Sequence, residues 1–412
     1  MHYDVFFAIS QTPVDGVLPS EATMFRNFFT EVEAADALGF DIAWIAESHL
    51  SSEVQKRHRQ PVIPHWDGEV GLNVDFLQLA THILRRTRRI ECGSAILNIL
   101  CNGGPVAHAE RIAAFLSLHG LDPAEQRRIH VGFAAGRFDF MNRAYGLVPR
   151  SPLEHALGPV LKGLMFREAA EIFVRALSGG ILSSDDVPPP VVRRSSFRDE
   201  AEWARVCAVA GHDGPEIELP RRFVFEALEI VPRAYRRELL QLLIGSHEPD
   251  LQEYVNRWAP VQVFNLSITR PEVIEDTHAR MARAYHPSGG AWARPYMPRT
   301  VFVFLNEQPG LTPDGRRAAA HEEARLALRA YWSALEGTID PKKVEGAADN
   351  ALVGNADDVA DQIVARFHPD DRLMLWFDFF NHDADRVCAN MEAFVREVVP
   401  RVEARLENRR SR

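Results

Sequence analysis

Cysteine is scarce in this sequence, with four residues among 412. No two of them have the short spacing of structural zinc sites, and the set suggests no disulfide framework. The four are Cys92, Cys101, Cys207 and Cys388. So few cysteines fit a reducing compartment, and we expect a cytoplasmic protein.

A membrane-spanning run and an excess of basic charge are also missing. No apolar stretch reaches the roughly 18 residues that a transmembrane helix needs. The first ten residues, MHYDVFFAIS, lack the charged region of a signal peptide. The formal net charge is −10, whereas nucleic-acid binding requires a basic surface. We therefore expect neither a membrane anchor nor a nucleic-acid partner.

Motifs for a dinucleotide or a metal ion are absent as well. No GxGxxG motif opens a helix after a strand, so the chain has no predicted nicotinamide-binding fold. The histidines His58, His65 and His82 are scattered without the spacing of metal ligands. We expect no metal site, which makes a metal-dependent barrel hydrolase the weakest alternative.

Apolar strands and amphipathic helices alternate along the chain, which is typical of a TIM barrel. Strands are predicted at 3–10, 41–46, 89–99, the start of 127–147, 238–245, 261–267, 300–306 and 372–380. Helices are predicted at 20–38, 74–87, 103–120, 153–178, from Pro249 onward, and at 271–285, 314–335 and 384–406.

The predicted fold is α/β, a single (β/α)8 barrel domain over 1–412 with two insertions. The polar, proline-containing stretch 51–73 follows strand 2 and is long for a βα loop. The segment 179–238 between helix 4 and strand 5 begins with a run rich in Ser, Pro and Asp and shows little clear periodicity. Loops at the carboxyl ends of barrel strands lie over the active site, so 51–73 is predicted to be a lid or a substrate wall.

The stretch 31–50, EVEAADALGFDIAWIAESHL, combines several of these signals. Apolar residues at helical spacing end at Gly39, where a helix favours a left-handed residue. A short buried strand then leads to Glu47, Ser48 and His49. This titratable group therefore lies just past the carboxyl end of an early strand, where α/β folds place their chemistry.

The string LGFDIAWIAESHL resembles the luciferase-like flavin monooxygenases, which carry an "alGFD-vWvaEHHf" motif. Ser48 stands in place of the first histidine of the family pair, and His49 keeps the second. The segments TRRIECGSAIL (87–97) and ALVGNADDVADQI (351–363) also resemble family motifs. The resemblance covers roughly 1–178 and 238–406.

This resemblance implies a monooxygenase that uses reduced FMN and dioxygen to oxygenate a small organic substrate. It also implies a separate NAD(P)H:flavin reductase and a homodimer that pairs through 20–38 and 74–87. A deazaflavin (F420)-dependent oxidoreductase of the same fold stays open, as does a flavin-binding protein without turnover.

The site residues follow from the motifs and the strand ends. His49 is the predicted catalytic residue. The predicted cofactor-binding residues are Ala95, Ile96, Ala134, Ala135, Gly136, Gly245 and Ser246. In the family a non-proline cis peptide lies at the position of Ala95–Ile96, and Ser246 precedes a helix start that favours an anion. The predicted substrate-pocket residues are Glu47, Ser48, Asn98 and Arg137. The candidate apolar walls are Phe7, Trp44, Ile96 and Phe377, although plain filling of the barrel is the preferred interpretation for each of them.

Overall fold

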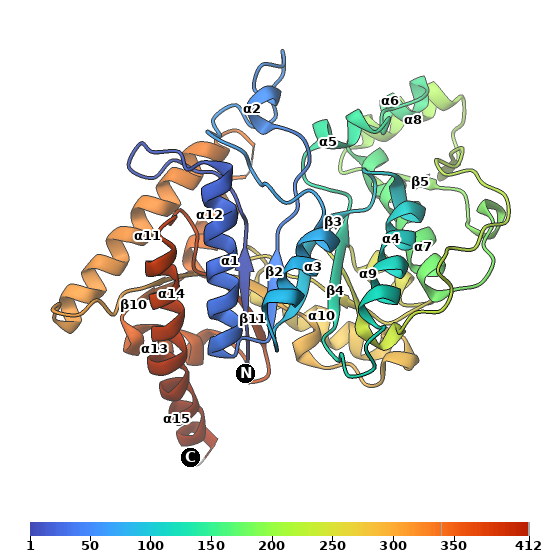
Figure 1. The fold of residues 1–412 in the computed structure, drawn as a ribbon. Helices are drawn as coiled ribbons and strands as arrows, with labels where there is room; N and C mark the ends of the chain where they lie inside the picture. The colour runs from blue at the N-terminus through green and yellow to red at the C-terminus, as the bar shows by residue number, and fades with distance from the viewer. Residues whose placement is uncertain (339, 411–412) are drawn as a thin grey trace.

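A curled sheet of nine parallel strands forms the centre of the computed structural model, which describes residues 1–338 and 340–410 (Figure 1). The strand order is β10–β9–β11–β1–β2–β3–β4–β7–β8. These strands are β1 (His2–Phe7), β2 (Ile42–Ile45), β3 (Glu91–Asn98), β4 (Ile129–Ala134), β7 (Leu240–Ile244), β8 (Val261–Val263), β9 (Arg299–Leu305), β10 (Leu352–Gly354) and β11 (Arg372–Trp376).

Helices flank the sheet on its outer side (Figure 1). The longer ones are α1 (Glu21–Leu38), α3 (Phe76–Arg86), α4 (Gly104–His119), α7 (Val160–Ser178), α8 (Glu200–Ala210), α10 (Pro271–Ala284), α11 (Pro313–Leu335), α13 (Ala356–Arg366), α14 (Ala384–Ala393) and α15 (Val399–Arg410). The shorter ones are α2 (Ser52–Gln55), α5 (Asp139–Ala144), α6 (Pro152–Ala156), α9 (Pro249–Val255) and α12 (Pro341–Asp349).

The two ends of the sheet approach each other at β8 and β9. The backbone N–H of Asn265 donates to the carbonyl of Pro298 at 2.9 Å, and that of Thr300 donates to the carbonyl of Asn265 at 3.2 Å. These bonds form an isolated parallel bridge between Asn265 and Arg299. The curled sheet is therefore consistent with the predicted TIM barrel.

All eight predicted strands are present, but the sheet has a ninth. β10 pairs with the second half of β9, and its three residues are too few to show a strand pattern in the sequence. The predicted helix 153–178 is divided into α6 and α7 around Gly158, whose φ of 54° lies in the left-handed region. The predicted closing helix is divided by a π-helical turn over Phe394–Val398.

The helix before β2 begins and ends where the sequence predicted. The Ser20 hydroxyl accepts a hydrogen bond from the backbone N–H of Thr23, and Gly39 adopts a φ of 90° beyond the last turn. Met24, Phe28 and Val32 recur at four-residue spacing and are buried against the sheet. This packing fixes where β2, and therefore Glu47 and His49, leave the barrel.

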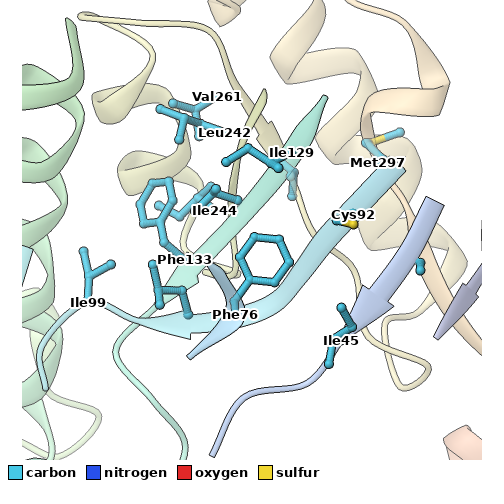
Figure 2. Packing of buried hydrophobic residues seen from close by; sticks show 14 of the residues in the cluster. Ile45, Phe76, Cys92, Ile99, Ile129, Phe133, Leu242, Ile244, Val261 and Met297 are labelled. Carbon is cyan, nitrogen blue, oxygen red and sulfur yellow. The ribbon is translucent and has the colours of Figure 1, made fainter. Parts of the chain in front are cut away.

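Strand side chains alternate between two cores. Outward-facing residues such as Ile45, Ile129, Phe133 and Ile244 form the core between strands and helices (Figure 2). Inside the curl lies a smaller cluster that includes Phe6, Trp44, Leu243, Phe264 and Met374. The indole N–H of Trp44 donates to Asp4 at 2.7 Å.

Three of the four candidate walls belong to these cores, in agreement with the preferred interpretation as barrel filling. Phe7 packs edge-on against Phe28 with ring centroids 5.3 Å apart, and Phe377 packs against Phe394. Trp44 fills the barrel interior.

The segment 179–238 has its own small structure beside α7. Strands β5 (Val191–Arg193) and β6 (Glu216–Glu218) pair antiparallel, and α8 lies between them in sequence. The buried Glu168 of α7 accepts the backbone N–H groups of Arg222 and Phe223 at 3.0 Å. These charge-assisted hydrogen bonds fix the segment to the barrel helix.

None of the helices within 1–338 and 340–410 combines the length and apolar character needed to cross a membrane.

Candidate active-site cavity

A large cavity of about 1930 Å³ opens at the carboxyl ends of the strands. Its wall includes the ends of β1, β2, β3, β4 and β11, the first half of β9, the turns after β7 and β8, and parts of α7 and α11. All twelve predicted site residues line this cavity, although they come from four separate strand ends. The structure thus brings these residues together at one cavity, and their roles stay predictions.

His49 and Glu47 form a buried pair in the cavity wall. The Nε2 atom of His49 lies 3.0 Å from Oε1 of Glu47, and the two side chains are 4% and 1% exposed. Burial raises the pKa of Glu47, and the hydrogen bond with His49 offsets part of that rise. The second carboxyl oxygen, Oε2, is buried without a hydrogen-bond partner among the described residues. The pair is therefore held at one fixed place in the cavity wall.

Ser48, the departure from the family motif, is enclosed by the loop that follows β2. Its backbone N–H donates to the carbonyl of Asn73 at 2.9 Å. Its Cβ lies 3.0 Å from where a side chain on Gly71 would begin. The loop is closed on itself by Glu69, which accepts hydrogen bonds from the hydroxyls of Ser51 at 2.6 Å and Ser52 at 2.9 Å. Residues 51–73 therefore form an ordered wall of the cavity.

Mostly small residues at the ends of β3, β4 and β7 form one part of the cavity wall. The peptide bond Ala95–Ile96 is cis, as the family resemblance predicted. A Cβ on Gly245 would lie 2.4 Å from Cδ1 of Ile96, and one on Gly136, whose φ is 70°, would lie 2.2 Å from Nδ2 of Asn98. With Ala134 and Ala135, the shelf, defined as residues 95–96, 134–136 and 245, has backbone surface for a planar ring.

Asn98 supports the neighbouring loop from the end of β3. Its amide Nδ2 donates to Oδ1 of Asn142 at 2.8 Å, and its Oδ1 accepts the backbone N–H of Leu100 at 3.1 Å. Asn142 in turn donates to the carbonyl of Ala135 at 3.0 Å. These bonds hold the chain after β4 in its course over the cavity.

Four arginines line the cavity, and three of them lack an ion-pair partner in the part of the chain that the structure describes. Arg137, Arg143 and Arg167 have no carboxylate within ion-pair distance among residues 1–338 and 340–410, whereas Arg193 is paired with Glu216 at 3.1 Å and Lys162 with Asp139 at 2.9 Å. Arg167 lies over the ring of Tyr254 at 3.9 Å. Uncompensated guanidinium groups bind phosphate well.

The helix start after Ser246 is a poorer anion site than the sequence suggested. The Ser246 hydroxyl accepts the backbone N–H of Glu248 at 3.2 Å. Helix α9 has only seven residues and carries Glu248 and Asp250 at its start. Because these carboxylates oppose an anion, the arginines are the better anion-binding groups. The sequence reasoning missed Arg143 and Arg167, which resemble ordinary polar residues of helices.

Aromatic residues line the opposite side of the cavity, which is formed by β1, β9, β11, α11 and the 51–73 loop. They are Phe6, Trp66, Phe302, Tyr331 and Trp376. Sequence reasoning singled out none of them. No group of three or more His, Cys, Asp and Glu side chains suited to a metal ion occurs in the described part of the chain.

Comparison with known proteins shows the family of the chain. The profile described as luciferase-like monooxygenase matches residues 3–369, so the chain belongs to this family. No curated protein matches the sequence.

Several solved structures share the fold. Monooxygenase RslO1 from Streptomyces bottropensis has 18% identity and a TM-score of 0.65, with 97% of this chain and 99% of that chain covered. The oxygenating constituent of 3,6-diketocamphane monooxygenase from Pseudomonas putida, in complex with FMN, has 14% identity, a TM-score of 0.53 and coverage of 97% and 98%. An F420-dependent secondary alcohol dehydrogenase in complex with an F420–acetone adduct has 14% identity, a TM-score of 0.51 and coverage of 97% and 98%.

Proposed function

We propose that this protein is an FMN-dependent monooxygenase that oxygenates a small organic substrate with dioxygen. Its family membership supports an oxidoreductase of this kind, and one structure of the same fold holds FMN. The observation that carries the proposal is the small-residue shelf beside the three uncompensated arginines. A flat ring system with a phosphate tail fits this combination.

Ala95, Ile96, Gly136 and Gly245 would support the flavin ring, and the arginines would hold its phosphate. When bound, reduced FMN supplies the two electrons with which one oxygen atom of dioxygen enters the substrate and the other leaves as water. The movement of protons and the exclusion of water depend on the side chains of this protein.

His49 is the residue best suited to move a proton at the cavity wall. Its imidazole is held by Glu47, and it lies at the strand end where barrel enzymes keep their reactive groups. Ser48 cannot act as a base near neutral pH without help, so a mechanism that uses both family histidines does not apply. The ordered 51–73 loop closes over this region and limits the access of water.

Reduced flavin would come from a separate reductase, because the sequence has no dinucleotide-binding motif. We also propose a homodimer that pairs through α1 and α3. Within one chain these helices are already joined, since Arg86 lies 3.0 Å from Glu33 and 4.6 Å from the ring centroid of Phe29. Light scattering at micromolar concentration should give twice the chain mass, and a monomer mass would refute the dimer.

Titration of the protein with FMN and with a deazaflavin, followed by fluorescence, tests the choice of cofactor. We expect FMN to bind more tightly, and oxygen uptake to require FMN, a reductase and NADH. Tighter deazaflavin binding without oxygen uptake would favour the F420-dependent alternative. FMN binding without any oxygen uptake across a panel of substrates would favour a binding protein without turnover.

A further inference from the structure

Five aromatic side chains form a continuous belt on one side of the cavity. The Trp66 and Tyr331 ring centroids are 6.3 Å apart, and Tyr331 continues to Phe302 at 6.4 Å. Phe302 stacks on Trp376 at 5.0 Å with an interplanar angle of 28°, and Trp376 reaches Phe6 at 4.6 Å. The aromatic belt is thus assembled from a loop, a helix and three strands.

Charged side chains are confined to the rest of the cavity wall. The described lining residues from β1, β9, β11, α11 and the 51–73 loop include none with a charge. The charged lining residues come from the end of β2, from the β4–α7 region and from the turns near 193 and 248. A ligand on the aromatic belt would meet no counter-ion there, and burying an unpaired charge is strongly unfavourable. The belt therefore selects for a neutral molecule.

Three polar atoms in or beside the belt lack hydrogen-bond partners among the described residues. The indole N–H of Trp376 lies close to the carboxyl group of Asp378. The other two are the indole N–H of Trp66 and the hydroxyl of Thr300, whose residues are 6% and 4% exposed. Thr300 lies two residues before Phe302 on β9 and so faces the same side. An indole can only donate a hydrogen bond, and a hydroxyl can also donate. Oxygen atoms on a ligand would satisfy both groups.

The cavity is large enough for two sizeable molecules. Its volume of about 1930 Å³ exceeds the roughly 300–1,000 Å³ typical of a site for one small ligand. A flavin on the shelf would therefore leave space along the belt. Aromatic rings favour offset-stacked and edge-to-face contacts with other rings, which a saturated molecule of equal size cannot make.

We propose that the aromatic belt is the substrate site, and that it binds a neutral, flat, multi-ring aromatic compound with oxygen substituents. This assignment rests on the proposed function, because it makes the belt the partner of a flavin held on the shelf. It narrows the substrate from any small organic molecule to one chemical class.

Equilibrium dialysis of the FMN-loaded protein against two C14 ketones tests the proposal. Anthrone is flat and aromatic, whereas cyclotetradecanone has the same number of carbon atoms and the same carbonyl group without rings of that kind. We expect anthrone to bind about tenfold more tightly, the size of one or two ring contacts, without releasing FMN. Anthracene-9-carboxylate should bind more weakly than anthrone because of its charge.

Two variants and one control locate the binding. Tyr331→Leu should weaken anthrone binding, whereas Tyr296→Leu should not, although Tyr296 is also a half-buried tyrosine in an aromatic cluster. Trp66→Phe keeps a ring and removes the N–H donor. It should lower affinity for anthrone by about fivefold, the usual worth of one hydrogen bond, and leave affinity for 9,10-dihydroanthracene, which has no oxygen, unchanged.

Equal affinity for the two ketones overturns the proposal, and so does displacement of FMN by anthrone, which would make the belt the flavin site. An unchanged anthrone affinity in both belt variants also overturns it. If the protein binds no FMN, but its flavin-free form still binds anthrone more tightly than cyclotetradecanone, the proposed function is refuted. The aromatic site is then still supported. The two failures are therefore distinguishable.

Discussion

The two sides of the cavity differ in the size and the charge of their side chains. The side made by β3, β4 and β7 has alanine and glycine at the strand ends, with Arg137, Arg143 and Arg167 beside them. The side made by β9, β11 and β1 has large aromatic residues and no charge. One barrel mouth therefore offers a bare, cationic surface for an anionic ring compound and a bulky, neutral surface for a second molecule. We expect substitutions on the two sides to change different binding constants.

The largest effect is expected at His49, which stands between the two sides. His49→Ala should lower coupled oxygenation by a factor on the order of 10²–10⁴, the usual contribution of a positioned acid–base group. The affinity for FMN should change little, because the shelf and the arginines are untouched. The measurement is product formed per NADH consumed, with hydrogen peroxide counted separately.

The exposed His368, outside the cavity, provides the control for this variant. His368→Ala should keep full activity. If His49→Ala also keeps full coupled activity, His49 is only a structural residue of the loop.

Gly245→Val changes only the side of the cavity that contains the small-residue shelf. The new side chain would collide with Ile96, whose Cδ1 lies 2.4 Å from the added Cβ. In the free protein Ile96 can relieve the clash by moving into the space of the flavin ring, so FMN binding has to restore the overpacked arrangement. At about 1–3 kcal/mol, this lowers FMN affinity by roughly 5- to 150-fold. Binding of anthrone to the flavin-free protein should be nearly unchanged. Fluorescence titration and dialysis measure the two affinities.

Gly346, which has open space around its Cα, is the matched control. Gly346→Val should leave FMN binding unchanged. A folded Gly245→Val protein with native FMN affinity would contradict the assignment of the shelf to the flavin ring.

Arg167 tests whether the cationic groups recognise a phosphate. Arg167→Met should weaken FMN binding by about tenfold, as expected for one charge-assisted hydrogen bond, while riboflavin, which lacks the phosphate, should bind as before. Arg257 is a suitable control, because it lies 5.1 Å from the same Tyr254 ring and does not line the cavity. Equal losses for FMN and riboflavin would mean that Arg167 only supports the wall.

The contrast between the two sides also explains what the sequence could predict. The side formed by β3, β4 and β7 could be predicted from local patterns, such as the strand ends near Ala95 and Gly136. The family resemblance also predicted the position of the cis peptide. The aromatic side depends on which way neighbouring residues face. Phe6 and Trp376 line the cavity, whereas Phe7 and Phe377 face the outer core.

Phe6 is followed directly by Phe7, and Trp376 by Phe377. Because both neighbours are aromatic, the sequence does not reveal which of them faces the cavity and which faces the outer core. Trp66 and Tyr331 lie on a loop and a helix far apart in the chain, and only the folded structure brings them together. The arginines were missed for a similar reason. A polar residue on an amphipathic helix, such as Arg167, is expected to face solvent unless the neighbouring loops are known.

The last prediction concerns protein stability instead of ligand binding, and it tests a buried acid close to the belt residue Trp376. Asp378 follows β11, two residues after Trp376, and burial raises its pKa to about 7. Burial and the nearby Asp378 also raise the pKa of Glu31 on α1. These carboxyl groups bind protons more tightly in the folded state than in the unfolded state. In the unfolded state the pKa of an aspartate is near 3.8. The free energy of unfolding should therefore fall as the pH rises from about 4 to 7.

Asp378→Asn should flatten this decline, which for one group amounts to at most about 1.4 kcal/mol per pH unit. Asp4 should leave a residual slope, because burial raises its pKa to about 6. Urea denaturation at pH 5, 6, 7 and 8 measures the slope, and Asp185→Asn, at a site whose side chain is 91% exposed, is the control. A slope in Asp378→Asn as steep as in the unsubstituted protein would mean that Asp378 is already ionised in the fold. The aromatic side would then rest on a buried anion, and its selection for neutral ligands would weaken.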